Sequence, residues 1–196
     1  MTRQGTIVTV PSDGYALSVL EAKRQLRLEP EDTDEEDHIA DLCAAAHRKI
    51  ERDLGYPILR QTLQTHLMGF PRGAIWLGGG ADAEVVSITY IDRAGEPQTV
   101  AVADWRLNAA GRIAELHRGP DFTWPATQCQ PGAVVIEWKA GWAKPSDVPE
   151  DLIHAMKLLV GHWDMNREAV VVGAISTEVQ ETLDDLLYQF RVPFVA

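Results

Sequence analysis

The sequence predicts an α+β fold, in which a helical core of two N-terminal and two C-terminal helices carries an inserted antiparallel β module. Two observations support this: helical periodicity is confined to the two ends of the 196-residue chain, and short strand-like runs fill its middle. Because no helix interleaves these runs, a doubly wound parallel sheet does not fit. The expected parts are residues 1–57 (an N-terminal arm and the first helices), 58–146 (a sandwich-like or barrel-like β insert) and 147–196 (the last helices and a tail).

Two start signals predict the N-terminal helices, after ten loosely alternating residues that suggest an extended arm. Ser18 and Glu21 form a capping-box pattern, in which each side chain accepts a hydrogen bond from an otherwise unpaired backbone N–H. This helix must be short, because Pro30 follows soon after it. Thr33 and Glu36 repeat the pattern and predict the start of a second helix.

The second helix has an acidic start and a regular apolar stripe. Seven of the nine residues from 29 to 37 are acidic, and negative charge there meets the positive end of the helix dipole. We interpret this run as a solvated helix start, with a docking surface as the alternative. Gly55 suits the left-handed residue that follows many helices. The stripe comprises Ile39, Cys43, Ala46, Ile50 and Leu54.

The middle of the chain contains short runs rich in β-branched and aromatic residues, separated by turn residues. Consecutive antiparallel strands at this spacing indicate a meander folded into a small sandwich or a partly closed barrel. Residues 92–95 (Asp-Arg-Ala-Gly) predict a turn into a further strand. The runs are residues 58–68, 74–77, 85–91, 98–107, 112–116 and 132–138. Their alternating apolar residues are Val86, Ile88 and Tyr90 in one run and Val134, Ile136 and Trp138 in another.

Helical spacing returns at Pro149, which is tolerated in a first turn, and Glu150 and Asp151 suit the positive end of the helix dipole. The third helix should be buried over a broad face, because its apolar residues cover two adjacent stripes. These residues are Leu152, Ile153, Met156, Leu159, Val160 and Trp163.

A fourth helix is predicted near the end of the chain, with Thr177 and Gln180 as its cap and Pro193 beyond its end. The preceding residues 169–176 (AVVVGAIS) are too apolar for a solvated loop, so we expect them to become ordered against a neighbouring copy or a partner. The apolar face of the fourth helix comprises Val179, Leu183, Leu186, Leu187 and Phe190.

The charge balance disfavours a sequence-specific nucleic-acid binder. With 18 basic and 29 acidic residues, the net charge is −11, and such a surface repels phosphates. We interpret the acidity first as a surface that keeps the protein soluble; the alternative is the lining of a tube that DNA must traverse without sticking. The start MTRQGTIVTV lacks the apolar core of a signal peptide, and no apolar run reaches the roughly 18 residues of a membrane span, so we expect a soluble protein.

No constellation of residues predicts catalysis, a metal or a cofactor. His154 and His162 lie about two helical turns apart, too far to share one metal ion. His38 and His47 fail in the same way. The glycines at 78–80 lack the Lys-Ser/Thr pair of a phosphate-binding loop and fit a hairpin tip better. The two cysteines lie far apart, near no metal-ligand spacing and without an adjacent base, as expected in a reducing cytoplasm.

Six tryptophans are the most unusual feature of the composition, and five of them fall in or beside the β insert. Those in alternating strands, such as Trp138, are expected in the core. Trp124, in the loop DFTWPAT, and Trp142, in the turn AGWAKP, are candidate contact residues, because binding groups are often carried on loops of a rigid module.

Several segments, in their order along the chain, resemble the phage head–tail connector family, the portal-proximal adaptor proteins of long-tailed phages and gene transfer agents. The resemblance covers about residues 15–192. Its most specific stretch is VPEDL followed by HW and NREAV, between residues 148 and 170. The supporting segments are LSVLEAKRQLRL, the acidic linker and helix that follow it, RQTLQTHLMGFP, SITYIDRAGE, WRLNAAGRIAEL and the TWPAT loop.

The resemblance implies a structural, non-enzymatic virion protein without a cofactor, assembled in the host cytoplasm and located in the virion neck. It implies a ring of about a dozen copies between the portal protein and the stopper or tail-terminator protein, with DNA passing through unbound. The helical part would build the ring, and the last helix and tail would reach the portal. The candidate portal contacts are therefore Leu183, Leu187, Phe190 and Phe194.

Two other functions remain open at this stage. A monomeric binding module would hold a peptide or a glycan through Trp124 and Trp142. A hydrolase with an unrecognised site would need a deep pocket with a perturbed carboxylate or histidine.

Overall fold

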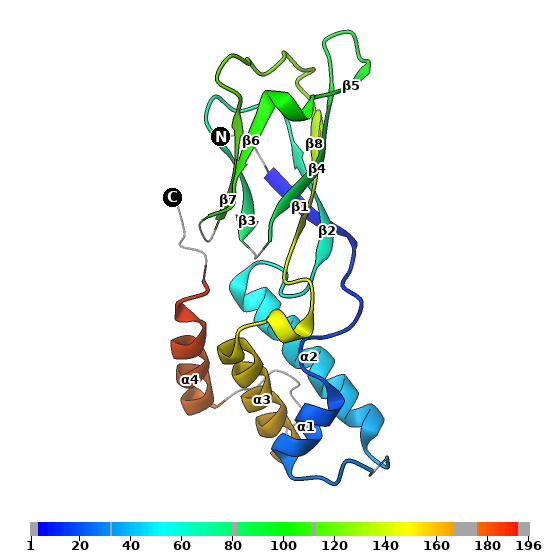
Figure 1. The fold of residues 1–196 in the computed structure, drawn as a ribbon, viewed down its shortest axis with the longest axis vertical. Coiled ribbons are helices and arrows are strands. Elements are labelled where there is room, and N and C mark those ends of the chain that lie inside the picture. The colour runs from blue at the N-terminus through cyan, green and yellow to red at the C-terminus, as the bar shows by residue number, and fades with distance from the viewer. Residues whose placement is uncertain (1–3, 32, 80–81, 111–112, 167–175, 192–196) are drawn as a thin grey trace. The chain divides into compact units, whose positions relative to one another are not determined.

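The computed structural model describes residues 4–31, 33–79, 82–110, 113–166 and 176–191. The chain divides into two compact units (Figure 1), which we call the β unit and the helical unit. The β unit comprises Met1–Ser12 and Arg60–Trp142, and the helical unit comprises Asp13–Leu59 and Ala143–Ala196. The predicted α+β class is confirmed. One assignment differs from the expected parts: the N-terminal arm, expected with the helices, belongs to the β unit.

The β unit contains two antiparallel sheets that are not closed into a barrel. One sheet has five strands in the order β1-β2-β8-β4-β5, and the other has three in the order β3-β7-β6. The strands of the first sheet are β1 (Gln4–Val10), β2 (Gln61–Leu67), β8 (Val134–Ala140), β4 (Glu84–Ile91) and β5 (Pro97–Thr99). Those of the second are β3 (Ile75–Gly79), β7 (Ile113–Arg118) and β6 (Trp105–Asn108), the last preceded by the 3-10 turn η1 (Val102–Asp104).

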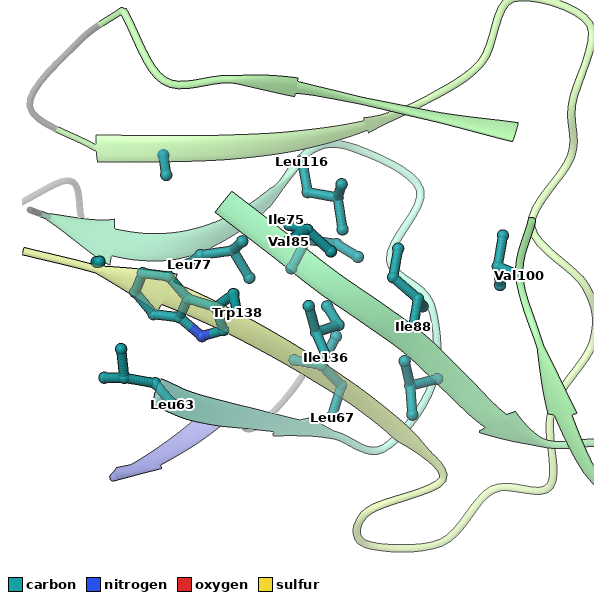
Figure 2. Close-up of a cluster of buried hydrophobic side chains, with 13 residues drawn as sticks. Leu63, Leu67, Ile75, Leu77, Val85, Ile88, Val100, Leu116, Ile136 and Trp138 are labelled. Atoms are coloured by element: carbon teal, nitrogen blue, oxygen red, sulfur yellow. The ribbon is translucent and has the colours of Figure 1, made fainter. Parts of the chain in front are cut away.

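Trp138 lies in the core of the β unit (Figure 2), as its alternation with Val134 and Ile136 predicted. Side chains on β2 and β8 alternate strictly between buried and partly buried positions. The indole N–H of Trp138 donates a hydrogen bond to Thr65 Oγ1 at 2.9 Å. A buried indole N–H needs such an acceptor, because its desolvation is otherwise uncompensated.

A β-bulge changes which side chains of β4 face the core. The register with β8 shifts between Val85 and Ser87. Val85 and Ile88 are therefore buried, whereas Val86 is 43% exposed. The predicted alternation that grouped Val86 with Ile88 is wrong here, since one extra residue moves a side chain to the opposite face of the strand.

Asp92 organises the predicted turn between β4 and β5. Its Oδ1 accepts hydrogen bonds from the backbone N–H of Ala94 at 2.8 Å and of Glu96 at 3.0 Å. Its Oδ2 accepts one from the Gln98 side chain at 3.2 Å. These bonds, above all that from Glu96, lower the pKa of Asp92, because they stabilise its charged form.

The helical unit contains α1 (Val19–Leu26), α2 (Glu36–Leu54), α3 (Glu150–Met165) and α4 (Thr177–Tyr188), with the 3-10 turn η2 (Pro145–Asp147) before α3. The capping box of Ser18 and Glu21 is confirmed. The second capping box is wrong, because Glu35 occupies the cap position and makes no side-chain cap bond. Helix α4 is capped by Ser176, whose hydroxyl accepts from Val179 N–H, one residue before the predicted Thr177.

Helix α3 packs against α1, α2 and α4, so it forms the centre of the helical unit. The predicted stripe of α2 is buried throughout. On α3, Leu152, Met156 and Leu159 are buried as expected, whereas Ile153 and Trp163 are only partly buried. The left-handed Gly55 ends α2, with φ of 77°.

His47 shows how the segment before α1 is held on α2. Its imidazole is buried, its Nδ1 accepts from the backbone N–H of Ala16 at 3.3 Å, and its Nε2 lies 3.3 Å from Glu51 Oε1. The same Glu51 oxygen accepts from Ile58 N–H at 2.8 Å. This histidine is therefore a structural residue of the helical unit.

Replacing Thr65 by valine should destabilise the protein by about 1–3 kcal/mol, because the Trp138 indole N–H would be buried without an acceptor. The matched control is Thr62→Val, on the partly exposed face of the same strand. Urea unfolding followed by tryptophan fluorescence measures both free energies. Equal stability of the two variants would contradict the structural role of this bond.

The contribution of Asp92 should depend on pH. Because its pKa is lowered in the folded state, its stabilisation is present above its ordinary pKa of roughly 4 and is lost as the pH falls through its folded value. Asp92→Ala should therefore melt below wild type at pH 7 and close to it near pH 2. The control is Asp121→Ala, which removes an exposed aspartate outside this turn and should leave the melting temperature close to that of wild type at both pH values.

Candidate assembly surfaces

The described part of the chain offers no arrangement for bond-making chemistry. Burial raises the pKa of the Cys43 thiol to about 11, with a smaller contribution from Glu21, so it stays protonated at neutral pH. A cavity of about 440 Å³ in the helical unit is lined by both Ser146 and His154. However, Ser146 donates its hydroxyl to Asp147 at 3.2 Å, and no described hydrogen bond joins it to the histidine.

The described residues form neither a metal site nor a membrane-spanning helix. No group of three histidine, cysteine or carboxylate side chains there lies close enough to hold a metal ion. His38 lies 3.8 Å from Asp164, and His117 lies 3.2 Å from Glu115, so each faces one carboxylate. None of the described helices combines the length and apolar character needed to cross a membrane.

Strand β1 is the most unusual surface of the β unit. It lies at the edge of the five-stranded sheet and pairs only with β2. Its apolar side chains are exposed on both faces: Ile7 by 53%, Val8 by 51% and Val10 by 56%. The strand carries no charge and no proline, the two devices that commonly protect an edge from pairing with another chain.

The opposite edge of the same sheet is protected. Strand β5 has only three residues and begins with Pro97, which has no backbone N–H to offer. The sheet therefore has one edge that can accept a further strand and one that cannot easily do so. The sequence left the role of the arm open, although the alternation in Thr-Ile-Val-Thr-Val was a usable strand signal.

The two candidate loop tryptophans contact different residues of the β unit. Trp124 stacks on Phe70, with ring centroids 4.5 Å apart and parallel planes, and meets Phe122 edge to face at 5.7 Å. It is partly buried against the core of the β unit. Trp142 is also partly buried, and its backbone oxygen accepts from Arg60 N–H at 3.0 Å. Neither is freely exposed, so their role as contacts stays a prediction.

Helix α4 turns its predicted contact residues inward. Leu183 and Leu187 are 0% exposed, because this face packs on α3 within the same chain. Phe190 is partly buried, and its backbone oxygen accepts from the Tyr56 hydroxyl at 2.8 Å. The two leucines therefore offer no surface to a partner in this fold. Phe194 and residues 169–175 lie outside the described residues.

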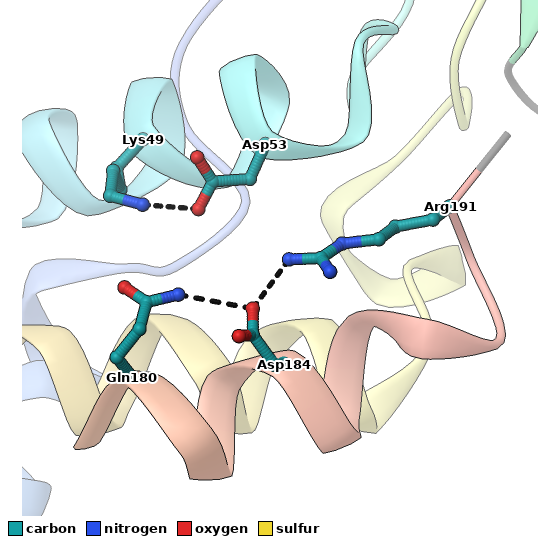
Figure 3. A network of polar contacts seen from close by, with 5 residues as sticks. All are labelled: Lys49, Asp53, Gln180, Asp184 and Arg191. Atoms are coloured by element: carbon teal, nitrogen blue, oxygen red, sulfur yellow. Dashed lines mark hydrogen bonds and ion pairs between the residues drawn. The ribbon is translucent and has the colours of Figure 1, made fainter. Parts of the chain in front are cut away.

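Polar side chains of α4 lie on the side of the helix that faces α2 (Figure 3). Asp184 Oδ1 accepts from the Gln180 side chain at 3.0 Å and from Arg191 at 2.5 Å, while Lys49 and Asp53 pair on α2. Tyr188, which the sequence did not single out, is 76% exposed on this helix.

The two units differ sharply in charge. Of the 18 basic and 29 acidic residues, the β unit holds eight of each, and the helical unit holds the remaining ten basic and 21 acidic ones. The whole net charge of −11 therefore belongs to the helical unit. Much of it gathers before α2 and in its first turn, in an acidic segment that we define as residues 29–31 and 33–37.

The β unit also carries a small cavity of about 290 Å³, which we call the basic pocket. It has two arginines and a histidine in its lining and no acidic residue. Gly119 suits a tight point in its wall, because a Cβ there would lie 3.1 Å from the backbone oxygen of Asp104, closer than an ordinary van der Waals contact. The lining comprises Arg72, Gly73, Ala74, His117, Arg118, Gly119 and Pro120.

Known proteins share this fold over nearly their whole length. A chain from the virion of a native gene transfer agent (GTA) particle is 24% identical, with a TM-score of 0.74 and coverage of 97% of both chains. A chain from the neck of an empty GTA particle, computed with C6 symmetry, is 23% identical, with a TM-score of 0.73, over 99% of this chain and 97% of that one. A chain from the neck of a native GTA particle, computed with C12 symmetry, is 21% identical, with a TM-score of 0.64 and coverage of 97% of both.

At these identities the similarity establishes the fold. No curated protein matches the sequence. The family model described as "Head completion protein" matches residues 17–183, which is most of the chain. The predicted resemblance to head–tail connector proteins is thereby confirmed. The chain belongs to the head completion protein family, and it is a structural virion protein rather than an enzyme.

Proposed function

We propose that this protein is a head–tail connector subunit that assembles as a ring in the virion neck. The ring would join the portal protein to the stopper or tail-terminator protein and leave a channel for DNA. Family membership supports a head-completion role. Similar folds occur in particle necks computed with C6 and C12 symmetry, which favours rotational assembly and is compatible with a dozen copies.

The open edge of β1 is the observation that carries this proposal. An uncharged strand with apolar side chains exposed on both faces is unfavourable in a permanent monomer, because it invites non-specific pairing. In an assembled particle the same strand gains hydrogen bonds and apolar contacts from a neighbour. Because β5 at the other edge is protected, the unequal edges favour contact with a different surface of the next copy. Such head-to-tail contacts close into a ring.

The charge distribution suits a component through which DNA passes. The helical unit carries the whole excess of acidic groups, and like charges keep a phosphate backbone from adhering to a surface. An acidic ring would therefore guide DNA without binding it. Its position in the virion neck and its assembly in the host cytoplasm belong to the same proposal.

A monomeric binder of a peptide or a glycan is less well supported. Such a module would present Trp124 on an open surface, but this indole is stacked on Phe70 and packed against the core of its own unit. The ring of Trp142 is partly buried. Neither side chain forms an open aromatic platform in the described structure.

Charging the edge strand tests the proposal. The double variant Ile7→Lys with Val8→Lys places a cation on each face of β1. Lysine side chains protect the edge strands of natural sheets from pairing with other chains. This variant should remain folded. On purified portal rings, its copies should bind one another at least about tenfold more weakly than wild-type copies do, which corresponds to a loss of about 1.4 kcal/mol or more of binding free energy. Light scattering and negative-stain images measure ring formation, and circular dichroism checks the fold.

The control is Val86→Lys, an exposed valine on β4, which is paired on both sides within the sheet. This variant should assemble like wild type. If the charged β1 variant forms rings as readily as wild type does, this strand edge plays no part in assembly. A wild-type chain that stays monomeric beside portal rings at all concentrations would overturn the connector proposal itself.

A further inference from the structure

We infer that the basic pocket of the β unit binds the acidic segment of a second copy of this chain, and so provides one head-to-tail contact of the ring. The inference rests on the proposed ring, and it adds the two surfaces that meet. It follows from the way charge is divided between the two units.

The basic pocket is built to receive an anion. Arg72 is exposed and makes no hydrogen bond or ion pair with any described residue. Arg118 uses one guanidinium nitrogen to donate to the backbone oxygen of Phe122 at 2.9 Å, which fixes the side chain and leaves its other donors available. Two guanidinium groups beside a cavity without acidic lining are suited to carboxylate oxygens.

His117 adds a third nitrogen-bearing side chain to the lining, and its Nε2 lies 3.2 Å from Glu115 Oε2. The imidazole therefore already faces a carboxylate, which is not part of the cavity lining. The uncompensated positive charge comes from the arginines, and we assign the anion contact to them.

The acidic segment has carboxylates to offer. Glu29, Glu31 and Asp37 are exposed, and no described residue pairs with them. One neighbouring carboxylate, Glu36, already lies 3.4 Å from the buried ammonium of Lys23. The segment thus keeps an excess of negative charge in the isolated chain, beyond what the start of α2 needs.

Charge complementarity favours a second copy as the occupant. Two helical units repel one another, because each carries the net charge of −11, whereas the β unit is neutral and displays its arginines locally. The attractive arrangement places the β unit of one copy against the helical unit of the next. The pocket and the segment are different surfaces, so this contact is heterologous, as a ring requires. DNA phosphates have a similar chemistry, but the acidic chain as a whole repels them.

Charge reversal followed by mixing tests the inference on portal rings. The pocket variant combines Arg72→Glu and Arg118→Glu, and the segment variant combines Glu29→Lys, Glu31→Lys and Asp37→Lys. The pocket variant places carboxylates opposite the acidic segment, and the segment variant removes the exposed carboxylates that the arginines would meet and puts ammonium groups in their place. Each variant alone should therefore form rings at least about tenfold less readily than wild type. Mixed in equal amounts, the two should recover ring formation, because in an alternating ring the introduced carboxylates meet the introduced ammonium groups and the unchanged arginines meet the unchanged carboxylates.

Matched controls separate this contact from general charge effects. Arg93→Glu is the control for the single pocket variant Arg72→Glu, because it makes the same change in net charge at an exposed position outside the pocket, and it should assemble like wild type. Arg72→Glu alone serves if loss of the Arg118 bond disturbs the fold. The wild-type contact should also weaken as the salt concentration rises from about 0.05 M to about 0.5 M, because the Debye length, about 10 Å at ~0.1 M, shortens over this range.

The outcomes are distinguishable. Recovery only in the mixture supports the inference. Normal rings from the pocket variant alone overturn it and leave the connector proposal intact. Failure of each variant without recovery on mixing also overturns it, and a gel-shift assay with duplex DNA then tells whether the pocket serves phosphates. If wild type forms no rings in the presence of portal rings, the connector proposal itself is wrong.

Discussion

The indole of Trp138 needs a hydrogen-bond acceptor inside the β unit, and the way this need is met holds the edge strand in place. The indole donates to Thr65 Oγ1 at 2.9 Å, and the same oxygen lies 2.9 Å from Thr6 Oγ1 on β1. The buried core, the second strand and the edge strand are thus linked through one hydroxyl. Because a buried polar group must be satisfied, this link helps to fix the register in which β1 displays Ile7 and Val8.

The two units differ in net charge, and this difference bears on which surfaces of two copies can approach one another. Neutrality of the β unit allows its strand edge and its basic pocket to approach another copy, whereas the excess of acid on the helical unit disfavours contact between two helical units. An assembly that follows these preferences alternates unlike surfaces. In the proposed ring, charge would give the contact its direction, and the exposed apolar side chains of β1 would add apolar contact area.

The candidate contacts on α4 illustrate a limit of helical patterns. The spacing of Leu183 and Leu187 correctly predicted an apolar face, but an apolar face is covered equally well by a partner or by the same chain. Here α3 covers it. The family resemblance assigned these residues to the portal, and only packing within the helical unit shows that they have no free surface. In the same way, the bulge beside Val86 depends on pairing with β8, which no local pattern reveals.

Local physical chemistry was enough to predict the helices, the capping box of Ser18, the turn at Asp92, the burial of Trp138 and the α+β class, because each depends on neighbours in sequence or on a regular period. The sequence also contained the order of segments that relates the chain to connector proteins. It did not reveal that the arm joins β2, that the acidic excess falls wholly in one unit, or that Arg72 and Arg118 share one cavity. Those features depend on contacts between residues far apart in the chain, which only the tertiary structure decides.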